Sequence, residues 1–127
     1  MLLSKRTIAK AYIQHLSNGD LVELLALFAP VAKVDSPIYK SKSATAFYQD
    51  LFQDTRASVL DLKGIFEDVE SGELALYFNY QWTLKDGGVV DFDVVDILHF
   101  DEQHRITYLK IIYDTVQSRP AVAGLNG

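Results

Sequence analysis

Hydrophobic and polar residues alternate strictly over two stretches in the second half of the chain, 73–84 and 89–100. Because successive side chains of a strand point to opposite faces, each stretch predicts a half-buried β-strand. The apolar positions are Leu74, Leu76, Phe78, Tyr80, Trp82 and Leu84 in the first, and Val90, Phe92, Val94, Leu98 and Phe100 in the second. Two more strands are predicted over 57–69, where Gly64 suggests a bulge, and over 106–116.

The first half of the chain has the spacing of helices instead. Ser4 is a suitable N-cap for a helix that runs to about Ser17, with Ile8, Tyr12 and Leu16 recurring on one face. A second helix is predicted over 21–29, capped by Asp20, and a third over 43–52. A short extended segment over 32–36 lies between them and ends at a proline.

Three helices followed by consecutive antiparallel strands predict an α+β fold, in which the helices pack on one face of a curved sheet. Such a sheet, mostly antiparallel and shaped like a cone, encloses an apolar interior. We expect a single domain over 1–117 and a flexible C-terminal tail over 118–127, where Pro120 and Gly124 suggest a loose extension.

Composition narrows the classes of function. The 127 residues have a net charge of −5 and scattered basic residues, which disfavours nucleic-acid binding. The chain contains no cysteine, so thiol chemistry and cysteine-bound metals are excluded. No apolar run approaches ~20 residues, so no membrane-spanning segment is expected. The start of the chain lacks the features of a signal peptide, and we expect a cytoplasmic protein. No nucleotide or metal motif is present, and we expect no cofactor.

Asp96 breaks the pattern of the 89–100 strand, because it occupies the apolar face between Val94 and Leu98. An ionised carboxylate on a core-facing position is unfavourable unless it is paired, hydrogen-bonded or protonated. Such breaks in consistent patterning tend to occur at functional sites. Asp96 is therefore the strongest candidate for chemistry, and the alternative is a structural carboxylate bonded to an amide or a tyrosine.

Several segments, in this order, resemble the nuclear transport factor 2-like superfamily: LFAPVAKVDSP, AFYQDLF, DVVDILHFDEQHRI and YLKIIYDTV. Within it the chain is similar to SnoaL-like polyketide cyclases and ketosteroid isomerases. The resemblance extends from about Lys5 to Val116. It implies a cone-shaped pocket and a homodimer formed through the outer face of the sheet, but this fold hosts enzymes and non-catalytic proteins alike.

The resemblance to ketosteroid isomerases implies roles for particular residues. Tyr12 and Asp96 match the tyrosine and the neutral aspartic acid that hold the substrate oxygen. The catalytic base does not carry over, because Ser36 stands before the proline and Asp35 comes one residue earlier. A one-residue offset turns a strand side chain to the opposite face, so Asp35 is expected to point away from the cone. Asp114 is the other candidate base, and its alternative is a solvated carboxylate at a strand end.

We therefore expect a small-molecule enzyme that acts on an apolar carbonyl compound by acid/base chemistry through an enolate. Its candidate catalytic residues are Asp96, Tyr12, Asp114 and Asp35. The residues expected to contact the ligand are Ser36, Tyr48, Phe78, Tyr80, Trp82 and Phe92. Two alternatives remain open: a non-catalytic domain that binds an apolar ligand, and a dimeric scaffold whose cone is a packed core.

Overall fold

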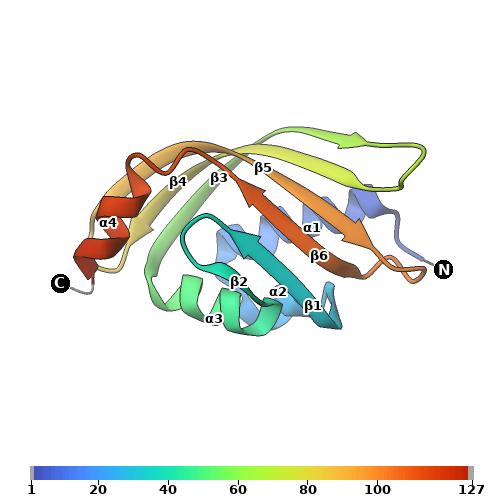
Figure 1. The fold of residues 1–127 in the computed structure, drawn as a ribbon, viewed down its shortest axis with the longest axis horizontal. Helices are drawn as coiled ribbons and strands as arrows, with labels where there is room; N and C mark the ends of the chain where they lie inside the picture. The colour runs from blue at the N-terminus through green and yellow to red at the C-terminus, as the bar shows by residue number, and fades with distance from the viewer. Residues whose placement is uncertain (1, 126–127) are drawn as a thin grey trace.

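The fold is an arched sheet of six strands with helices packed beneath it (Figure 1). A computed structural model describes residues 2–125. The strand order is β2-β1-β6-β5-β4-β3, and the sheet is curved but does not close. The predicted α+β class is confirmed. The strands are β1 Phe28–Ser36, β2 Lys40–Ser43, β3 Thr55–Glu67, β4 Leu74–Leu84, β5 Val89–Phe100 and β6 Ile106–Ile112.

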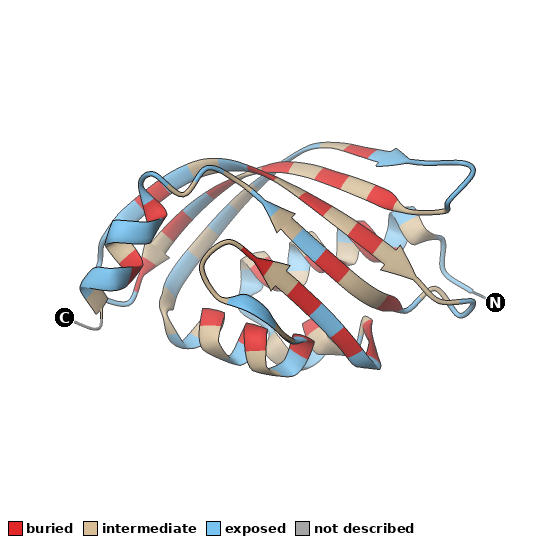
Figure 2. Cartoon of the chain, in the orientation of Figure 1, coloured by how far each residue is buried: buried red, intermediate tan, exposed pale blue. Residues whose placement is uncertain are grey.

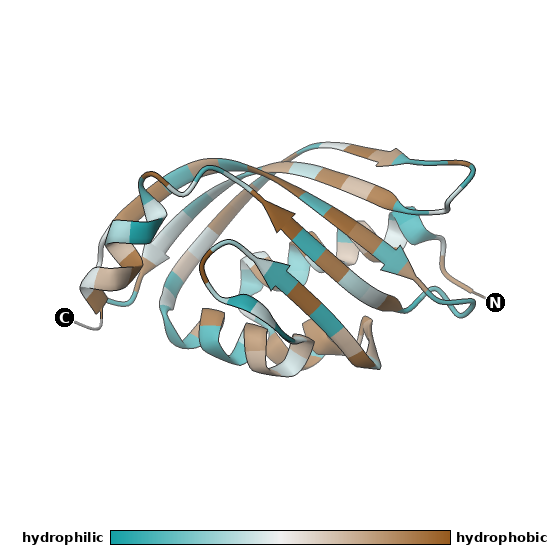
Figure 3. Ribbon diagram, viewed as in Figure 1, coloured by the Kyte–Doolittle hydropathy of each residue, from teal (hydrophilic) through white to brown (hydrophobic). Residues whose placement is uncertain are grey.

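Strands β3 to β6 form an antiparallel meander. Its register determines which inward side chains lie opposite one another on neighbouring strands. Leu76 of β4 lies opposite Asp96 of β5, which lies opposite Ile111 of β6. Along β4 and most of β5, buried residues alternate with intermediate or exposed ones as predicted (Figure 2), and the hydropathy colours follow the same alternation (Figure 3). The inward parity of β5, including Asp96, therefore faces the helices.

Three of the helices begin where the sequence predicts them. They are α1 Lys5–Asn18, α2 Leu21–Leu25 and α3 Ala44–Gln53. In each, the side chain of the preceding residue (Ser4, Asp20 or Ser43) accepts a hydrogen bond from a backbone N–H of the first turn. Helix α2 is shorter than the predicted 21–29, because the chain enters β1 at Phe28 and pairs there with Ile106 of β6.

The β1–β2 hairpin is a feature that the sequence did not reveal. Strand β1 is longer than the expected 32–36 segment and runs parallel to β6, while β2 pairs antiparallel to its outer edge. Lys40 adopts a left-handed conformation with φ 64°, which is uncommon for a residue other than glycine. Strand β2 could not be recognised from alternating apolar and polar residues, because its residues are polar on both faces.

The bulge expected at Gly64 is present, since the β3–β4 register shifts between Leu62 and Gly64. Strand β3 is an edge strand, and α1 covers part of its free edge. Arg6 of α1 donates to the Ile65 carbonyl at 3.3 Å, and Ser17 donates to the Ser58 carbonyl at 3.4 Å. These bonds satisfy edge carbonyls that would otherwise be open to another strand.

The C-terminal segment differs from the expected loose extension. Strand β6 ends at Ile112 instead of reaching residue 116, and Ser118–Leu125 forms helix α4 at the end of the arch away from the N-terminus (Figure 1). Pro120 lies in the first turn, where it is compatible with a helix. Val122 is buried against the core, which gives the helix a packing energy that its sequence pattern does not show. Residues 126–127 of the expected tail lie outside the described residues.

Candidate functional site

Asp96 lies inside the arch with its carboxyl group removed from solvent. The residue is 1% exposed, and neither carboxyl oxygen has a hydrogen-bond partner among residues 2–125. Burial raises the pKa of Asp96 well above its usual range, because desolvation disfavours the charged form. The group is therefore held as a neutral carboxylic acid, which can donate a proton from one oxygen and accept one at the other.

Tyr12 of α1 is hydrogen-bonded to Tyr48 of α3 and not to Asp96. The two hydroxyl oxygens are 2.6 Å apart, and the rings meet edge to face with centroids 6.1 Å apart. Burial is the main cause that raises the pKa of each tyrosine, and the neighbouring Asp96 contributes to both. A pair of hydroxyl groups shares one hydrogen, which leaves the second hydrogen available to another acceptor.

A cavity of about 40 Å³ lies between the helices and the inner face of the sheet. Its polar lining residues are Tyr12, Ser36, Tyr39, Tyr80, Asp96 and Tyr113, and its apolar ones are Leu16, Phe47, Leu51, Phe78, Trp82, Phe92, Val94 and Ile111. Five of the six residues expected to contact a ligand line this cavity. Tyr48, the sixth, lies behind Tyr12 and supports its hydroxyl group.

The large aromatic side chains present their rings to the cavity, while bonds to residues behind them hold their polar atoms. The Tyr80 hydroxyl lies 2.8 Å from the Ser58 hydroxyl, and the Trp82 indole N–H donates to the Thr55 hydroxyl at 2.7 Å. Because the polar atoms of Tyr80 and Trp82 are hydrogen-bonded to residues of β3, the part of each side chain that faces the cavity is an apolar ring. Few lining groups therefore remain free to form a hydrogen bond with a ligand. The main one is the carboxyl group of Asp96, whose two oxygens have no partner among the described residues.

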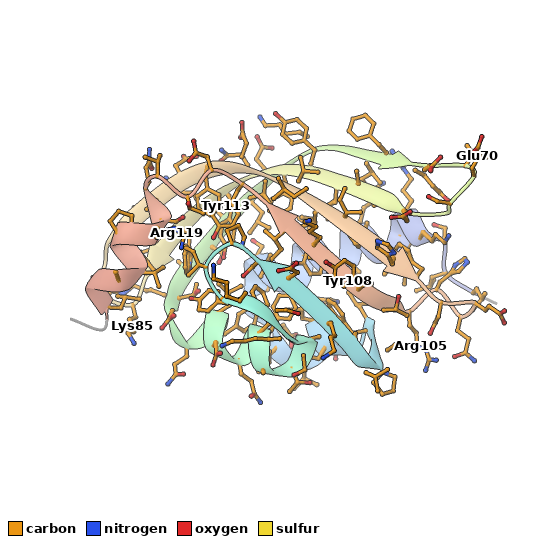
Figure 4. All side chains as sticks on the ribbon, in the orientation of Figure 1. Glu70, Lys85, Arg105, Tyr108, Tyr113 and Arg119 are labelled. Carbon is orange, nitrogen blue, oxygen red and sulfur yellow. The ribbon has the colours of Figure 1, made fainter. Side chains whose placement is uncertain are left out.

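One end of the cavity lies beside α4 and the β1–β2 turn. Tyr113 and Arg119 lie near each other at this end of the arch (Figure 4), and Arg119 donates to the Pro37 carbonyl at 3.3 Å. The Tyr113 ring stacks on Phe92 with centroids 4.5 Å apart. Tyr39 lines the same cavity and donates to the Asp54 carboxylate at 2.6 Å.

The other two candidate carboxylates are outside the cavity. Asp35 is on the outer face of β1, level with Lys110 of β6, and its carboxylate accepts a weak hydrogen bond from Tyr108 at 3.4 Å. This placement agrees with the one-residue offset seen in the sequence. Asp114 is exposed after the end of β6, where its carboxylate accepts from the Val116 N–H. Neither is positioned to face Asp96, so the described lining contains a single carboxyl group.

The family profile of the SnoaL-like domain matches residues 9–109. The chain belongs to the SnoaL-like family. A search of curated proteins gives no significant sequence match, whereas solved structures reveal many similar folds. All the residues that line the cavity of this SnoaL-like chain, except Ile111 and Tyr113, fall within the matched residues.

Three solved structures illustrate the likeness. AusH from Aspergillus nidulans is 15% identical, with 87% of this chain and 84% of that chain covered and a TM-score of 0.72. SalBIII, an epoxide hydrolase/cyclase-like enzyme of polyether salinomycin pyran ring formation, is 13% identical, with 87% and 90% covered and a TM-score of 0.76. A putative SnoaL-like polyketide cyclase from Shewanella denitrificans is 16% identical, with 94% and 97% covered and a TM-score of 0.74. At these identities the likeness is one of fold.

Apart from Asp96, the described part of the SnoaL-like chain places no charged side chain in the cavity lining. Residues 2–125 contain no cluster of three histidine or acidic side chains suited to a metal ion, and no lysine or arginine lines the cavity described above. No helix in this part of the chain is long and apolar enough to cross a membrane. Tyr39 and Tyr113 also line the cavity, although neither was predicted from the sequence. Tyr113 continues the aromatic pattern of β6, but Tyr39 depends on the hairpin that the sequence did not show.

Proposed function

We propose that this SnoaL-like protein is an enzyme that interconverts the keto and enol forms of an apolar carbonyl compound, with Asp96 as its only proton-transferring carboxyl group. The observation that supports the proposal is the buried Asp96, whose two oxygens lack protein partners and which lines the cavity. A single group suffices here because the carbonyl oxygen and the neighbouring carbon of a substrate are close together.

In the proposed step, Asp96 donates its proton from one carboxyl oxygen to the carbonyl oxygen of the substrate. Its other oxygen takes a proton from the adjacent carbon. The C–H electron pair forms the new C=C bond, and the π electrons of the C=O bond form the new O–H bond. Asp96 ends protonated on the opposite oxygen, so the catalyst is regenerated without a second base or a cofactor. General acid–base catalysis of this kind contributes about 10²- to 10⁴-fold.

Tyr12 is proposed to assist by donating a second hydrogen bond to the same carbonyl oxygen. Tyr12 lines the cavity and Tyr48 does not, so Tyr48 is placed to donate to Tyr12 while the Tyr12 hydrogen is directed to the substrate. Burial keeps both hydroxyl groups protonated, because it raises the pKa of each tyrosine. A donor fixed in advance toward developing negative charge is worth about 3 to 4 kcal/mol in acyl-transfer enzymes.

The size and lining of the cavity restrict the ligand. A volume of about 40 Å³ is room for a few water molecules, whereas pockets for drug-sized ligands have about 300–1,000 Å³. A cavity of this size therefore admits only the oxygen-bearing end of a ligand. A larger substrate requires the end of the cavity beside α4 to widen. Because no cation lines the cavity, the part of the ligand that enters is neutral and apolar apart from its oxygen.

The proposal is tested without knowledge of the natural substrate. Cyclohexanone is incubated in D₂O with the protein, and the exchange of its α-protons is followed by NMR. We expect the wild-type chain to accelerate exchange and Asp96→Asn to lose about 100-fold or more of that acceleration. Asp114→Asn is the matched control, since it makes the same change at an exposed carboxylate. Equal exchange by wild type and Asp96→Asn would remove Asp96 from the mechanism.

A second function is favoured by one observation, the lack of a second carboxylate in the described lining. In this alternative, the neutral Asp96 binds the oxygen of an apolar ligand and no proton is transferred. The two functions differ in one measurement: the alternative predicts saturable ketone binding, which Asp96→Ala weakens, with no acceleration of α-proton exchange by the wild-type protein.

A further inference from the structure

Helix α4 lies at one end of the arch and is held there by few interactions. It has eight residues, of which only Ser118 and Val122 are buried. Residues 113–117, which connect it to β6, lie in neither a helix nor a strand. Because isolated helices shorter than about 12–15 residues are marginally stable in water, the position of α4 depends on these two side chains and on its hydrogen bonds to the rest of the chain.

Arg119 joins α4 to the β1–β2 turn. Its guanidinium group donates to the Pro37 carbonyl at 3.3 Å and to the Thr115 hydroxyl at 3.3 Å. The bond to Pro37 is the one side-chain hydrogen bond between α4 and this turn among residues 2–125. Arg119 is exposed, so water competes for the bond and its net contribution is small.

Ser118 opposes the position that α4 occupies. It is 0% exposed, and its hydroxyl oxygen has no hydrogen-bond partner among the described residues. The Tyr113 side chain lies beside it, but the two do not form a hydrogen bond of ordinary geometry. Burying an unpaired hydroxyl group is unfavourable. Outward movement of α4 would return this group to water and remove that cost.

Tyr113 connects α4 to the Asp96 cavity. Its ring lines the cavity and stacks on Phe92. Burial raises the pKa of Tyr113, and the neighbouring Ser118 and Arg119 partly offset this rise, which places the first turn of α4 next to the tyrosine. The helix therefore lies against a wall of the cavity, at the end that must widen for a larger ligand.

We infer that α4 is a lid that opens about residues 113–117 to admit a ligand to the Asp96 cavity, with Arg119 as the latch that holds it against the β1–β2 turn. The inference rests on the proposed function in taking this cavity as the ligand site. It needs no proton transfer by Asp96, so the two proposals can fail separately.

The chain contains no cysteine, so a single introduced cysteine can report the opening of the lid. Val94 lines the cavity and is 2% exposed, and the thiol of Val94→Cys therefore reacts with iodoacetamide only when the cavity opens. Val34→Cys is the matched control, because Val34 is buried but does not line the cavity. Each rate is divided by that of the same thiol in the urea-unfolded chain. We expect Val94→Cys to react more than about tenfold faster than Val34→Cys, since local opening requires less free energy than global unfolding.

Two adjacent substitutions in the Val94→Cys protein should act in opposite directions. Arg119→Met removes the latch and should speed the reaction about fivefold, the effect of one net hydrogen bond. Ser118→Ala removes the unpaired hydroxyl group and should slow the reaction about fivefold. Arg105→Met makes the same change as Arg119→Met at an exposed arginine at the other end of the arch (Figure 4) and should leave the rate unchanged.

Equal rates for the two cysteines would mean that the whole fold opens, and would overturn the lid. So would substitutions at Arg119 and Ser118 that leave the rate unchanged or shift it in the same direction.

A second measurement needs no cysteine. The backbone amides of α4 should exchange faster than those of β4 and β5, and Ser118→Ala should slow their exchange. Amides of α4 that exchange as slowly as those of β4 and β5 would also overturn the lid. If Asp96→Asn exchanges the α-protons of cyclohexanone as fast as wild type while these results hold, the proposed catalysis fails and the lid remains.

Discussion

Replacing Asp96 by asparagine should stabilise the fold more strongly as the pH rises. The asparagine side chain has nearly the same shape and does not titrate, so the difference between the two proteins isolates the ionisation of Asp96. Burial raises the pKa of Asp96 in the folded state above its unfolded value of about 3.9. The native state therefore holds one more proton than the unfolded state between the two pKa values. The stability contributed by Asp96 is complete below the unfolded pKa and is lost as the pH rises toward the folded pKa.

The magnitude follows from the proton difference. One extra proton in the native state changes the free energy of unfolding by about 1.4 kcal/mol per pH unit. From pH 4.5 to 6.5, wild type should lose up to about 2.6 kcal/mol relative to Asp96→Asn, the full amount applying where the pH stays below the folded-state pKa of Asp96. This is a large share of the ~5–15 kcal/mol that stabilises a typical domain. All other titrating groups are common to both proteins and cancel in the comparison.

Urea unfolding at several pH values, followed by the fluorescence of the buried Trp82, measures this difference. Asp114→Asn serves as control, because it makes the same substitution at an exposed carboxylate. If the difference in the free energy of unfolding between wild type and Asp96→Asn stays constant from pH 4.5 to 6.5, the raised pKa of Asp96 is refuted. It would mean that Asp96 ionises in the folded state as readily as in the unfolded chain, and that it is not a buried acid.

Four further outcomes are expected. Tyr48→Phe should destabilise the fold by about 1–2 kcal/mol in urea unfolding, since it leaves the buried Tyr12 hydroxyl without its partner, and should slow α-proton exchange. Val122→Ala should speed amide exchange in α4 and the association of ketone probes, because α4 is held partly by that buried side chain. Light scattering should show a dimer that Ile97→Lys on the outer face dissociates; a monomeric wild type would contradict this. With cyclohex-3-en-1-one, NMR should show α-proton exchange without migration of the double bond into conjugation.

The alternation of β4 and β5 could be predicted because a sheet with one buried face imposes a period of two on its sequence. The same reasoning predicted the inward position of Asp96, since its parity was that of Val94 and Leu98. The Gly64 bulge also left a visible sign, a glycine inside a strand pattern. The local pattern of apolar and polar residues was thus enough to predict the central strands of the fold and the inward position of Asp96.

Features that depend on distant contacts could not be predicted in this way. Strand β2 is polar on both faces and exists because β1 offers it an edge, so the position of Tyr39 was hidden. Helix α4 depends on the burial of Val122 in a core built from earlier segments. The bond between Tyr12 and Tyr48 joins α1 to α3, and their sequence separation gives no indication that they meet.

The arrangement of Asp96 limits the chemistry that this cavity can perform. Because Asp35 and Asp114 lie outside the described lining, a proton removed from a substrate must return through the same carboxyl group that holds the substrate oxygen. While one oxygen of Asp96 is bound there, the other reaches the adjacent carbon and not a carbon two bonds further along the ring. Proton transfers between neighbouring atoms are therefore possible, whereas a shift across a longer conjugated system requires a second base. This is the physical reason to expect α-proton exchange without double-bond migration, and it separates the proposed activity from that of an isomerase with a carboxylate at the position of Ser36.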